Sequence, residues 1–339
     1  MKYLALTYVI AGIGVGIFIW LQLPLPWLLG PIFACLIAAL AGVPMKGNKL
    51  INDAMRSILG VAVGATFTTT LLISMAAMWP TLLMIPVMVA CIAVIGVPYF
   101  QRVWGFDFAT SYYSAMPGGL QDMLAFGEEA GGDVRALSLI HATRVMVVVV
   151  ALPFILQGYW GADLTNPPGA AASTIDPSQM LLMVFCGIAG WQGAKALVMF
   201  GASILGPLIL AAIMALLGVL QHRPPAEAIW MAQFFIGMTV GTKYAGVTGA
   251  EVRKDVAAAL GFCLILIALT FVFAEAVHLF HLASPMETLL AFAPGGQAEM
   301  TVLALIVGAD MAFVIAHHVL RIFVVILGAP IAARLWKAK

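Results

Sequence analysis

Charged residues are scarce in this sequence, and their scarcity excludes most soluble folds. Only 9% of the 339 residues are Asp, Glu, Lys or Arg, whereas 63% are hydrophobic and the mean hydropathy is +1.07. An ordinary soluble domain carries about 25% charged residues. Water is therefore not the main solvent of this chain. The formal net charge of +1 also provides no broad basic surface, so we expect no nucleic-acid partner.

Cysteine is rare too. The four cysteines are widely spaced inside apolar runs, at Cys35, Cys91, Cys186 and Cys263. This spacing is typical of buried packing residues and fits neither a disulfide framework nor a zinc site. Cysteine therefore says nothing about function. We expect no metal and no cofactor. The first apolar run also lacks a small-residue cleavage site, so residues 1–21 are predicted to remain as a helix instead of being removed as a signal peptide.

Long apolar runs, in contrast, recur along the whole chain. Examples are residues 3–21, 78–99 and 255–279. About 20 apolar residues in a helix cross a hydrocarbon layer of roughly 30 Å. The sequence therefore predicts an all-α polytopic membrane protein whose surroundings are a lipid bilayer.

A duplication is visible at an offset of 177 residues. The segment PGGLQDM at 117–123 returns as PGGQAEM at 294–300, and 294 − 117 = 177. Other matches fall in the same register: Gly60 and Gly64 with Gly237 and Gly241, and Asp133, His141 and Arg144 with Asp310, His318 and Arg321. Several matches in one order favour duplication over chance. We predict a first membrane repeat at 1–157, a periplasmic linker rich in Pro, Gly, Ala and Ser at 158–178, and a second repeat at 179–339.

Each half is predicted to contain five transmembrane helices and one unusual segment, at 107–129 and at 286–307. Each unusual segment has Pro-Gly-Gly near its middle. Proline removes a hydrogen-bond donor and glycine loosens a helix, so the chain must break, bend or turn back there. Arms of about 10 residues would reach about 15 Å, half of the hydrocarbon thickness. The alternatives are a re-entrant hairpin and a broken helix that spans the membrane.

The positions of Lys and Arg favour the hairpins, because basic residues that flank membrane spans stay in the cytoplasm. With both segments re-entrant, thirteen of the sixteen Lys and Arg lie inside, only Arg223 lies outside, and Arg144 and Arg321 fall within spans. Five crossings per half then give the two repeats opposite orientations, with both termini in the cytoplasm. We therefore predict inverted repeats in the inner (cytoplasmic) membrane of a bacterium, an architecture found in secondary transporters.

The breaks are the first candidate site for a small-molecule solute. A helix that begins inside a membrane directs free N–H groups and a partial positive charge at whatever lies before it. The two breaks consist of Pro117, Gly118 and Gly119 and of Pro294, Gly295 and Gly296. They would hold an anionic group of a solute, although such glycines also permit close helix packing. We interpret Gly60, Gly64, Gly237 and Gly241, which have no proline beside them, as packing residues.

Ionisable residues near the breaks complete the predicted site. Asp122 and Glu299 stand five residues after the prolines, where each could bind a coupling proton or sodium ion or cap a helix N-terminus. Arg144 and Arg321 lie within apolar spans, so each must meet a carboxylate, a carbonyl terminus or the solute. His141 and His318 share a helix face with these arginines, and Asp133 and Asp310 lie eleven residues before them. For these histidines and aspartates, an ion-coupling role and a structural role are both open.

The two breaks also differ in their surroundings. Gln121 and Gln297 are polar residues beside the breaks, but they are not at equivalent positions. Tyr112, Tyr113 and Ser114 in the first arm correspond to Leu289, Leu290 and Ala291 in the second. This asymmetry would suit one half that binds solute and another that binds the coupling ion.

With the segments LLGPI at 28–32, MPGGLQDM at 116–123 and APGGQAEM at 293–300, the chain resembles the AbrB-type membrane family over nearly its full length. This family, marked by a duplicated module, is distinct from the soluble DNA-binding regulators of the same name. More distantly the chain is similar to the cation/proton antiporter and anion transporter superfamily. That resemblance implies inverted repeats, discontinuous helices and transport by an elevator motion. Members of the family have been labelled regulators or ammonia monooxygenases.

We therefore expect a secondary transporter of a small organic anion, coupled to H⁺ or Na⁺, and not an enzyme. One alternative is a membrane-embedded regulator or sensor that acts through a partner. Another is a metal-dependent oxygenase, for which the sequence offers few ligands, such as His278 with His281 and His317 with His318. The solute, the coupling ion, the direction of transport and the oligomeric state stay open, and a homodimer is among the assemblies allowed.

Overall fold

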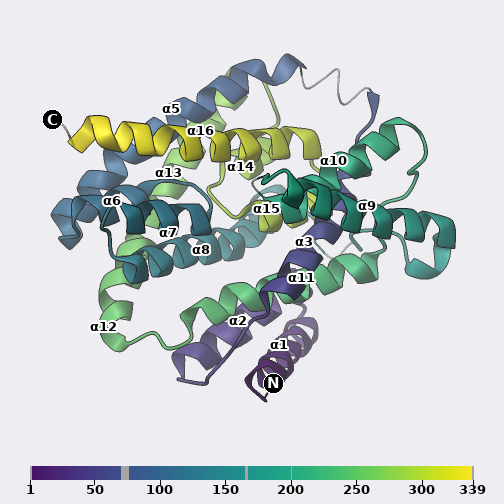
Figure 1. Ribbon diagram of the computed structural model, residues 1–339, viewed down its shortest axis with the longest axis horizontal. Coiled ribbons are helices and arrows are strands. Elements are labelled where there is room, and N and C mark those ends of the chain that lie inside the picture. The colour runs from purple at the N-terminus through teal and green to yellow at the C-terminus, as the bar shows by residue number, and fades with distance from the viewer. Residues whose placement is uncertain (1, 70–75, 165–166, 200, 338–339) are drawn as a thin grey trace. The chain divides into compact units, whose positions relative to one another are not determined.

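The computed structural model describes residues 2–69, 76–164, 167–199 and 201–337, and every regular element in these ranges is a helix (Figure 1). The π-helical turn η2 (Tyr99–Val103) continues α5, and η5 (Val252–Val256) joins α12 to α13. The α-helices in chain order are α1 (Lys2–Trp20), α2 (Pro26–Leu40), α3 (Lys49–Gly64), α5 (Trp79–Pro98), α6 (Phe108–Ala115), α7 (Leu120–Glu129), α8 (Val134–Trp160), α9 (Pro177–Ala196), α10 (Ala202–Leu216), α11 (Ala226–Gly241), α12 (Gly249–Glu251), α13 (Ala257–Leu279), α14 (Pro285–Phe292), α15 (Gln297–Val307) and α16 (Met311–Lys337).

Five helices in the described ranges are long and apolar enough to cross a membrane. They are Tyr3–Trp20, Trp79–Val103, Val134–Trp160, Gly249–Leu279 and Met311–Ala333. Three further apolar helices, α2, α10 and α15, are shorter. The prediction of an all-α chain with membrane-spanning helices is confirmed to this extent.

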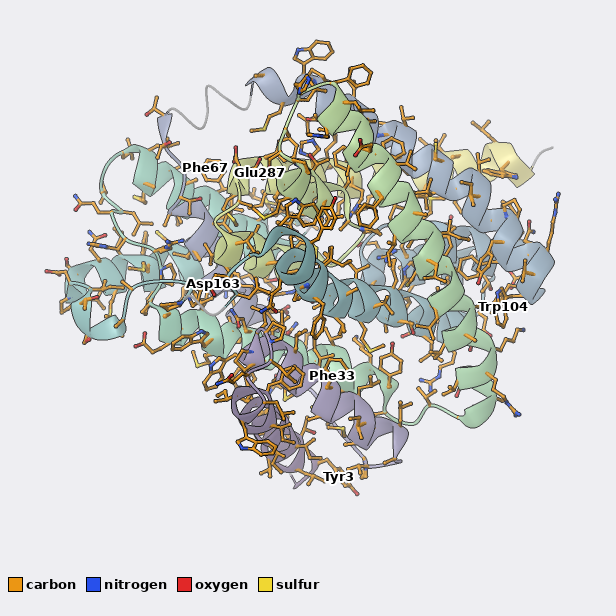
Figure 2. The ribbon with its side chains drawn as sticks, turned by 180° about the vertical axis from the view of Figure 1, so that it is seen from behind. Tyr3, Phe33, Phe67, Trp104, Asp163 and Glu287 are labelled. Atoms are coloured by element: carbon orange, nitrogen blue, oxygen red, sulfur yellow. The ribbon has the colours of Figure 1, made fainter. Side chains whose placement is uncertain are left out.

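The outward surfaces of the long helices are apolar where a soluble protein would be polar. Large side chains such as Val9 and Ile13 on α1 and Leu264 and Val272 on α13 are more than half exposed. Figure 2 shows carbon-rich side chains projecting from the helices, among them Tyr3 at the start of α1. Contiguous apolar surface on this scale is typical of a face in contact with lipid.

The chain divides into two compact units, and each unit takes segments from both halves of the sequence. Unit 1 comprises Met1–Ala76, Pro153–Gly246 and Ala298–Ala312, and unit 2 comprises Ala77–Leu152, Val247–Gln297 and Phe313–Lys339. Unit 1 therefore contains α1 to α3, α9 to α11 and nearly all of α15. Unit 2 contains α5 to α7, α12 to α14 and most of α8 and α16.

In unit 1, glycines let helices from different halves approach backbone to backbone. A Cβ atom on Gly60 of α3 would lie 2.3 Å from the carbonyl oxygen of Ile204 in α10. A Cβ atom on Gly237 of α11 would lie 2.3 Å from the carbonyl oxygen of Leu28 in α2. Gly64 and Gly241, one turn further along, are equally crowded. The packing interpretation of these four glycines is confirmed. Gly60 and Gly237, which are equivalent in the two halves, each pack against a backbone carbonyl of the other half.

Gly60→Ala is expected to lower the free energy of unfolding by about 1–3 kcal/mol, because a fixed backbone carbonyl occupies the space of the new methyl group. Gly12→Ala is the matched control, since nothing lies within 4 Å of a Cβ atom there. The control should be neutral or up to about 1 kcal/mol more stable, through helix propensity. Thermal unfolding of both variants in detergent measures the difference, and equal stability would refute the packing role.

In unit 2, α5 and α13 pack against each other through aromatic side chains. The rings of Phe100 and Phe262 are 4.8 Å apart, and the Tyr99 hydroxyl donates to the carbonyl of Ala258 at 3.0 Å. The short helix α6 is tied to α16 by a hydrogen bond from the Tyr112 hydroxyl to the carbonyl of Ala329, at 2.9 Å. These contacts hold α6 and the first Pro-Gly-Gly segment in the interior of the unit.

The segment predicted as a linker is docked on the start of α11, within unit 1. The amide of Ala226 donates to the carbonyl of Ala170 at 2.9 Å, and the amide of Ala172 donates to Glu227 Oε2 at 3.0 Å. The segment is described except for residues 165–166. Its residues Ala170 and Ala172 are therefore held against α11 within unit 1.

Candidate functional site

The helix is interrupted at both Pro-Gly-Gly segments, as the sequence predicts. In the first half α6 ends at Ala115 and α7 begins at Leu120, and in the second half α14 ends at Phe292 and α15 begins at Gln297. The prolines and the first glycine of each segment are buried, whereas Gly119 and Gly296 are half-buried. Each break thus leaves the last carbonyls of one helix and the first amides of the next inside the protein.

Each break is held by an arginine from the following long helix. Arg144 of α8 donates from Nη1 to the carbonyl of Met116 at 3.0 Å and from Nη2 to the carbonyl of Gly118 at 2.9 Å. Arg321 of α16 donates in the same way to the carbonyls of Ala293 and Gly295, at 2.7 and 3.0 Å. Both arginines are only 3% exposed. The sequence left three kinds of partner open for each arginine: a carboxylate, a carbonyl terminus or the solute. In the structure both arginines bind carbonyl groups of the breaks.

A histidine one turn before each arginine binds the preceding arm. His141 Nε2 lies 2.9 Å from the carbonyl of Tyr113, and His318 Nε2 lies 2.9 Å from the carbonyl of Leu290. Because a carbonyl only accepts, the ring nitrogen donates. The sequence pattern His-x-x-Arg thus covers three carbonyls at the end of each first arm, with identical residue spacing in the two halves.

The first arm and the second arm of the first segment lie against each other. The rings of Tyr113 in α6 and Phe126 in α7 are 6.2 Å apart. The hydroxyl of Thr110, near the start of α6, accepts a hydrogen bond from the amide of Asp133, just after α7, at 2.8 Å. A continuous helix would separate Tyr113 and Phe126 by about 20 Å. The chain therefore returns close to its starting point.

The balance of polar groups at the breaks favours negative charge. At a helix break the carbonyl end is partly negative and the amide end partly positive. The arginines and histidines cover the carbonyl ends. The Nε atoms of Arg144 and Arg321 are buried and have no hydrogen-bond partner in the part of the chain that the structure describes. Each break therefore contains a buried guanidinium Nε–H group without a hydrogen-bond partner among the described residues. The first amides of α7 and α15, like those of any helix, have no carbonyl partner within their own helix.

The acidic residues near the breaks have different surroundings. Asp122 is half-buried in the first turn of α7. Glu299, in the first turn of α15, is 4% exposed and belongs to unit 1. Its Oε2 atom has no hydrogen-bond partner within the described ranges. The buried carboxyl of Glu299 is therefore the stronger candidate of the two for binding a proton or a cation.

Asp133 has a structural task at the start of α8. Its Oδ1 atom accepts hydrogen bonds from the amides of Arg135 and Ala136, at 2.9 and 3.0 Å, as a helix N-cap does. Asp310 stands at the equivalent position, directly before α16. The position of the Asp133 carboxylate is therefore explained by its role as a helix cap, and no bound ion is needed to explain it.

The two glutamines are placed differently. Gln121 lies in α7, but its side chain is outside the part that the structure describes. Gln297 begins α15, is half-buried, and its Nε2 atom has no partner among the described residues. Tyr112, Tyr113 and Ser114 are all buried in the first arm. The first arm therefore has buried hydroxyl groups at the positions where the second arm has Leu289, Leu290 and Ala291.

Carbonyl termini were among the partners that the sequence left open for the two arginines, and the structure shows which carbonyls these are: Met116 and Gly118 for Arg144, and Ala293 and Gly295 for Arg321. Each arginine follows its partners by 28 and 26 residues in both halves. In the residues described, no three His, Cys, Asp or Glu side chains group around one point as metal ligands would. His317, named with His318 as a possible ligand, bonds the carbonyl of Phe313 through Nδ1 at 2.7 Å.

Comparison with known proteins identifies relatives along most of the chain. Residues 27–337 match the family model described as "Transition state regulatory protein AbrB". "Uncharacterized protein YhjN" of Bacillus subtilis (strain 168) is 28% identical over 329 residues, which cover 90% of this chain and 85% of the relative. "Putative regulator AbrB" of Escherichia coli (strain K12) is 24% identical over 319 residues, covering 94% of this chain and 91% of the relative.

Proposed function

This chain belongs to the AbrB family, and from that premise we propose that it is a secondary transporter of a small organic anion in the bacterial inner membrane. Transport would be coupled to H⁺ or Na⁺ and would use alternating access of the elevator type. The single observation that carries the proposal is the pair of arginine-held breaks in unit 2. No other feature of the described residues gathers so many unpaired polar groups in an apolar interior.

The chemistry of the breaks supports an anionic solute. Because Arg144 and Arg321 cover the carbonyl ends, the dipole at each break is no longer balanced, and the amide end of the next helix dominates. Free amides at a helix start bind carboxylates and phosphates well. The buried guanidinium Nε–H group, which has no hydrogen-bond partner among the described residues, would add a charged donor.

The return of the first segment on itself supports a re-entrant hairpin. Thr110, in the first turn of the first arm, and Asp133, which follows the second arm, are hydrogen-bonded although they are 23 residues apart. With a hairpin in each half, five crossings remain per half, and the two repeats enter the membrane in opposite orientations. Inverted repeats of this kind, 1–157 and 179–339, place their breaks near the midplane.

The division into two units supports an elevator motion. Both breaks, both arginines and both histidines belong to unit 2. In our proposal unit 2, which contains both breaks, carries the solute. His141 and His318 position the arms, Asp133 and Asp310 are structural, and Asp122 or Glu299 binds the coupling ion.

Uptake into proteoliposomes tests the proposed function. Purified protein is reconstituted, and a panel of labelled small organic anions is offered with a proton or a sodium gradient. We expect uptake of at least one anion that depends on one of the gradients and is lost in the Glu299→Gln variant. No uptake of any anion, together with no binding to the purified protein, would contradict the proposal.

A regulatory role is the second candidate, because the family model and one relative carry the word regulator in their names. In that case the protein would bind the same kind of ligand at the breaks and act through another membrane protein. Ligand binding without flux, in the experiment above, would favour the regulator over the transporter.

A further inference from the structure

A cavity of about 260 Å³ lies within unit 1. Three stretches of chain form it: the end of α3, the turn before α11, and the end of α15 with the turn that leads to α16. Its exposed lining residues are Arg223 and Gly308. Its apolar wall consists of four residues that are at most 6% exposed, namely Ala304, Leu305, Ala309 and Met311. The cavity therefore combines a charged residue at the surface with an apolar interior.

Arg223 is the lining residue that can recognise a polar group of a ligand. It is the charged residue of the lining, and the ion pair found among the described residues does not involve it. The hydroxyl of Thr66, which also lines the cavity, donates its proton to the carbonyl of Val63 at 2.7 Å. A guanidinium group binds a carboxylate through two parallel N–H groups. The cavity therefore suits a ligand with one anionic group.

Two acidic residues are close to the lining residues in sequence, but neither lines the cavity. Asp310 stands directly before α16, at the position where Asp133 caps α8 in the first half. Glu299 is part of α15, but its side chain leaves the helix about 140° around the axis from that of Ala304, at about 100° per residue. No acid in the lining therefore offsets the positive charge of Arg223.

We propose that this cavity binds a small monocarboxylate with an apolar tail, whose carboxylate lies on Arg223 and whose tail lies against the apolar wall. The volume corresponds to about nine water molecules at roughly 30 Å³ each, so a ligand of about that number of non-hydrogen atoms fits. The breaks belong to unit 2, so this is a separate site, and it does not depend on the proposed function. In the topology proposed above, the ligand enters from the periplasmic side.

Three matched ligands test the site on the full-length protein. Hexanoate has the charge and the tail, hexanamide has the tail without the charge, and acetate has the charge without the tail. Calorimetry measures their binding in phosphatidylcholine nanodiscs, which contain no anionic lipid that could compete. We expect hexanoate to bind at least about 10-fold more tightly than acetate, because each buried CH₂ group contributes about fourfold. It should bind at least about 5-fold more tightly than hexanamide.

Variants of Arg223 locate the binding. Because its side chain is exposed, replacement should leave the protein folded, which thermal unfolding checks. Arg223→Gln is expected to weaken hexanoate binding at least about 5-fold and to leave hexanamide binding unchanged. Arg223→Lys keeps the charge and should weaken hexanoate binding less than about 3-fold. Arg135→Gln, which removes the exposed arginine of the ion pair with Glu251, is the matched control and should bind hexanoate like the unaltered protein.

The inference is overturned if hexanoate shows no saturable binding, or if acetate or hexanamide binds as tightly as hexanoate. It is also overturned if Arg223→Gln binds hexanoate as tightly as the unaltered protein, because the ligand would then lie elsewhere. None of these results bears on anion uptake into proteoliposomes, which tests the breaks. Conversely, hexanoate binding that depends on Arg223 supports the site even when no anion is transported.

Discussion

Arg144→Ala is expected to lower the free energy of unfolding by about 3–6 kcal/mol, because two buried hydrogen bonds from a charged donor, each contributing about 1.5–3 kcal/mol, disappear together. The carbonyls of Met116 and Gly118 would be left without donors in an interior that water does not reach. Arg321→Ala should behave in the same way, because its two bonds have the same arrangement. Either variant should be poorly folded in detergent.

Two comparisons separate this effect from a general loss of charge. Arg144→Lys keeps the charge but replaces the planar guanidinium with a single ammonium group. Its free energy of unfolding should therefore fall by about half as much as that of Arg144→Ala. Arg135→Ala removes an arginine whose side chain is 45% exposed and which is paired with Glu251. That surface pair should contribute about 0–1 kcal/mol. Thermal unfolding followed by fluorescence measures all three variants. If Arg144→Ala unfolds at the same temperature as Arg135→Ala, the arginine does not hold the break.

Gly119→Asp is expected to abolish transport while leaving the protein folded. Gly119 is the N-cap of α7 and has φ −66° and ψ 140°, a conformation that any residue adopts. An aspartate there would accept hydrogen bonds from the first amides of α7, the groups that we assign to the solute. Two carboxylates about 4 Å apart repel each other by about 4 kcal/mol, which corresponds to roughly a thousandfold in binding.

Gly119→Asn is the matched control for this prediction. Asparagine caps a helix about as well as aspartate but carries no charge. Both variants should unfold within about 1 kcal/mol of the unaltered protein. Transport should be lost with aspartate and largely kept with asparagine, as measured by uptake into proteoliposomes. Equal uptake by the two variants would mean that no anion binds at the start of α7.

The helices themselves could be predicted closely from the sequence. The apolar run at 78–99 corresponds to α5 (Trp79–Pro98), and the run at 255–279 corresponds to α13 (Ala257–Leu279). Such runs are decided locally, because each must satisfy its own backbone in an apolar medium. The breaks were equally predictable, since proline and two glycines interrupt any helix.

The grouping of helices into units was not accessible from the sequence. A duplication suggests two consecutive bodies, yet Gly60 of the first half packs on Ile204 of the second, and Gly237 packs on Leu28. This exchange arises because small residues on α3 and α11 fit the backbone of the second helix of the opposite half, α10 and α2 respectively. Nothing in a single sequence tells which small residue meets which helix.

The roles of the ionisable residues were predictable only in part. The position of Arg144 in an apolar span indicates that a partner exists, because an unpaired buried guanidinium is costly. Which partner it has depends on how α8 packs against α6, and the structure shows that the partner is the backbone. Asp133 stands directly before a long helix, and an acidic residue at that place is a local signal for a helix cap. The hydrogen bonds that its carboxylate accepts from two backbone amides agree with this role.

In our proposal the two breaks belong to copies with opposite orientations in the membrane, and cysteine accessibility tests this most directly. Val103 and Phe280 are equivalent positions before the two broken segments and are 66% and 71% exposed. In a chain whose four native cysteines are replaced, each position is changed to cysteine and treated with a membrane-impermeant thiol reagent. We expect Val103→Cys to react only from the cytoplasmic side and Phe280→Cys only from the periplasmic side. Reaction of both from the same side would contradict it.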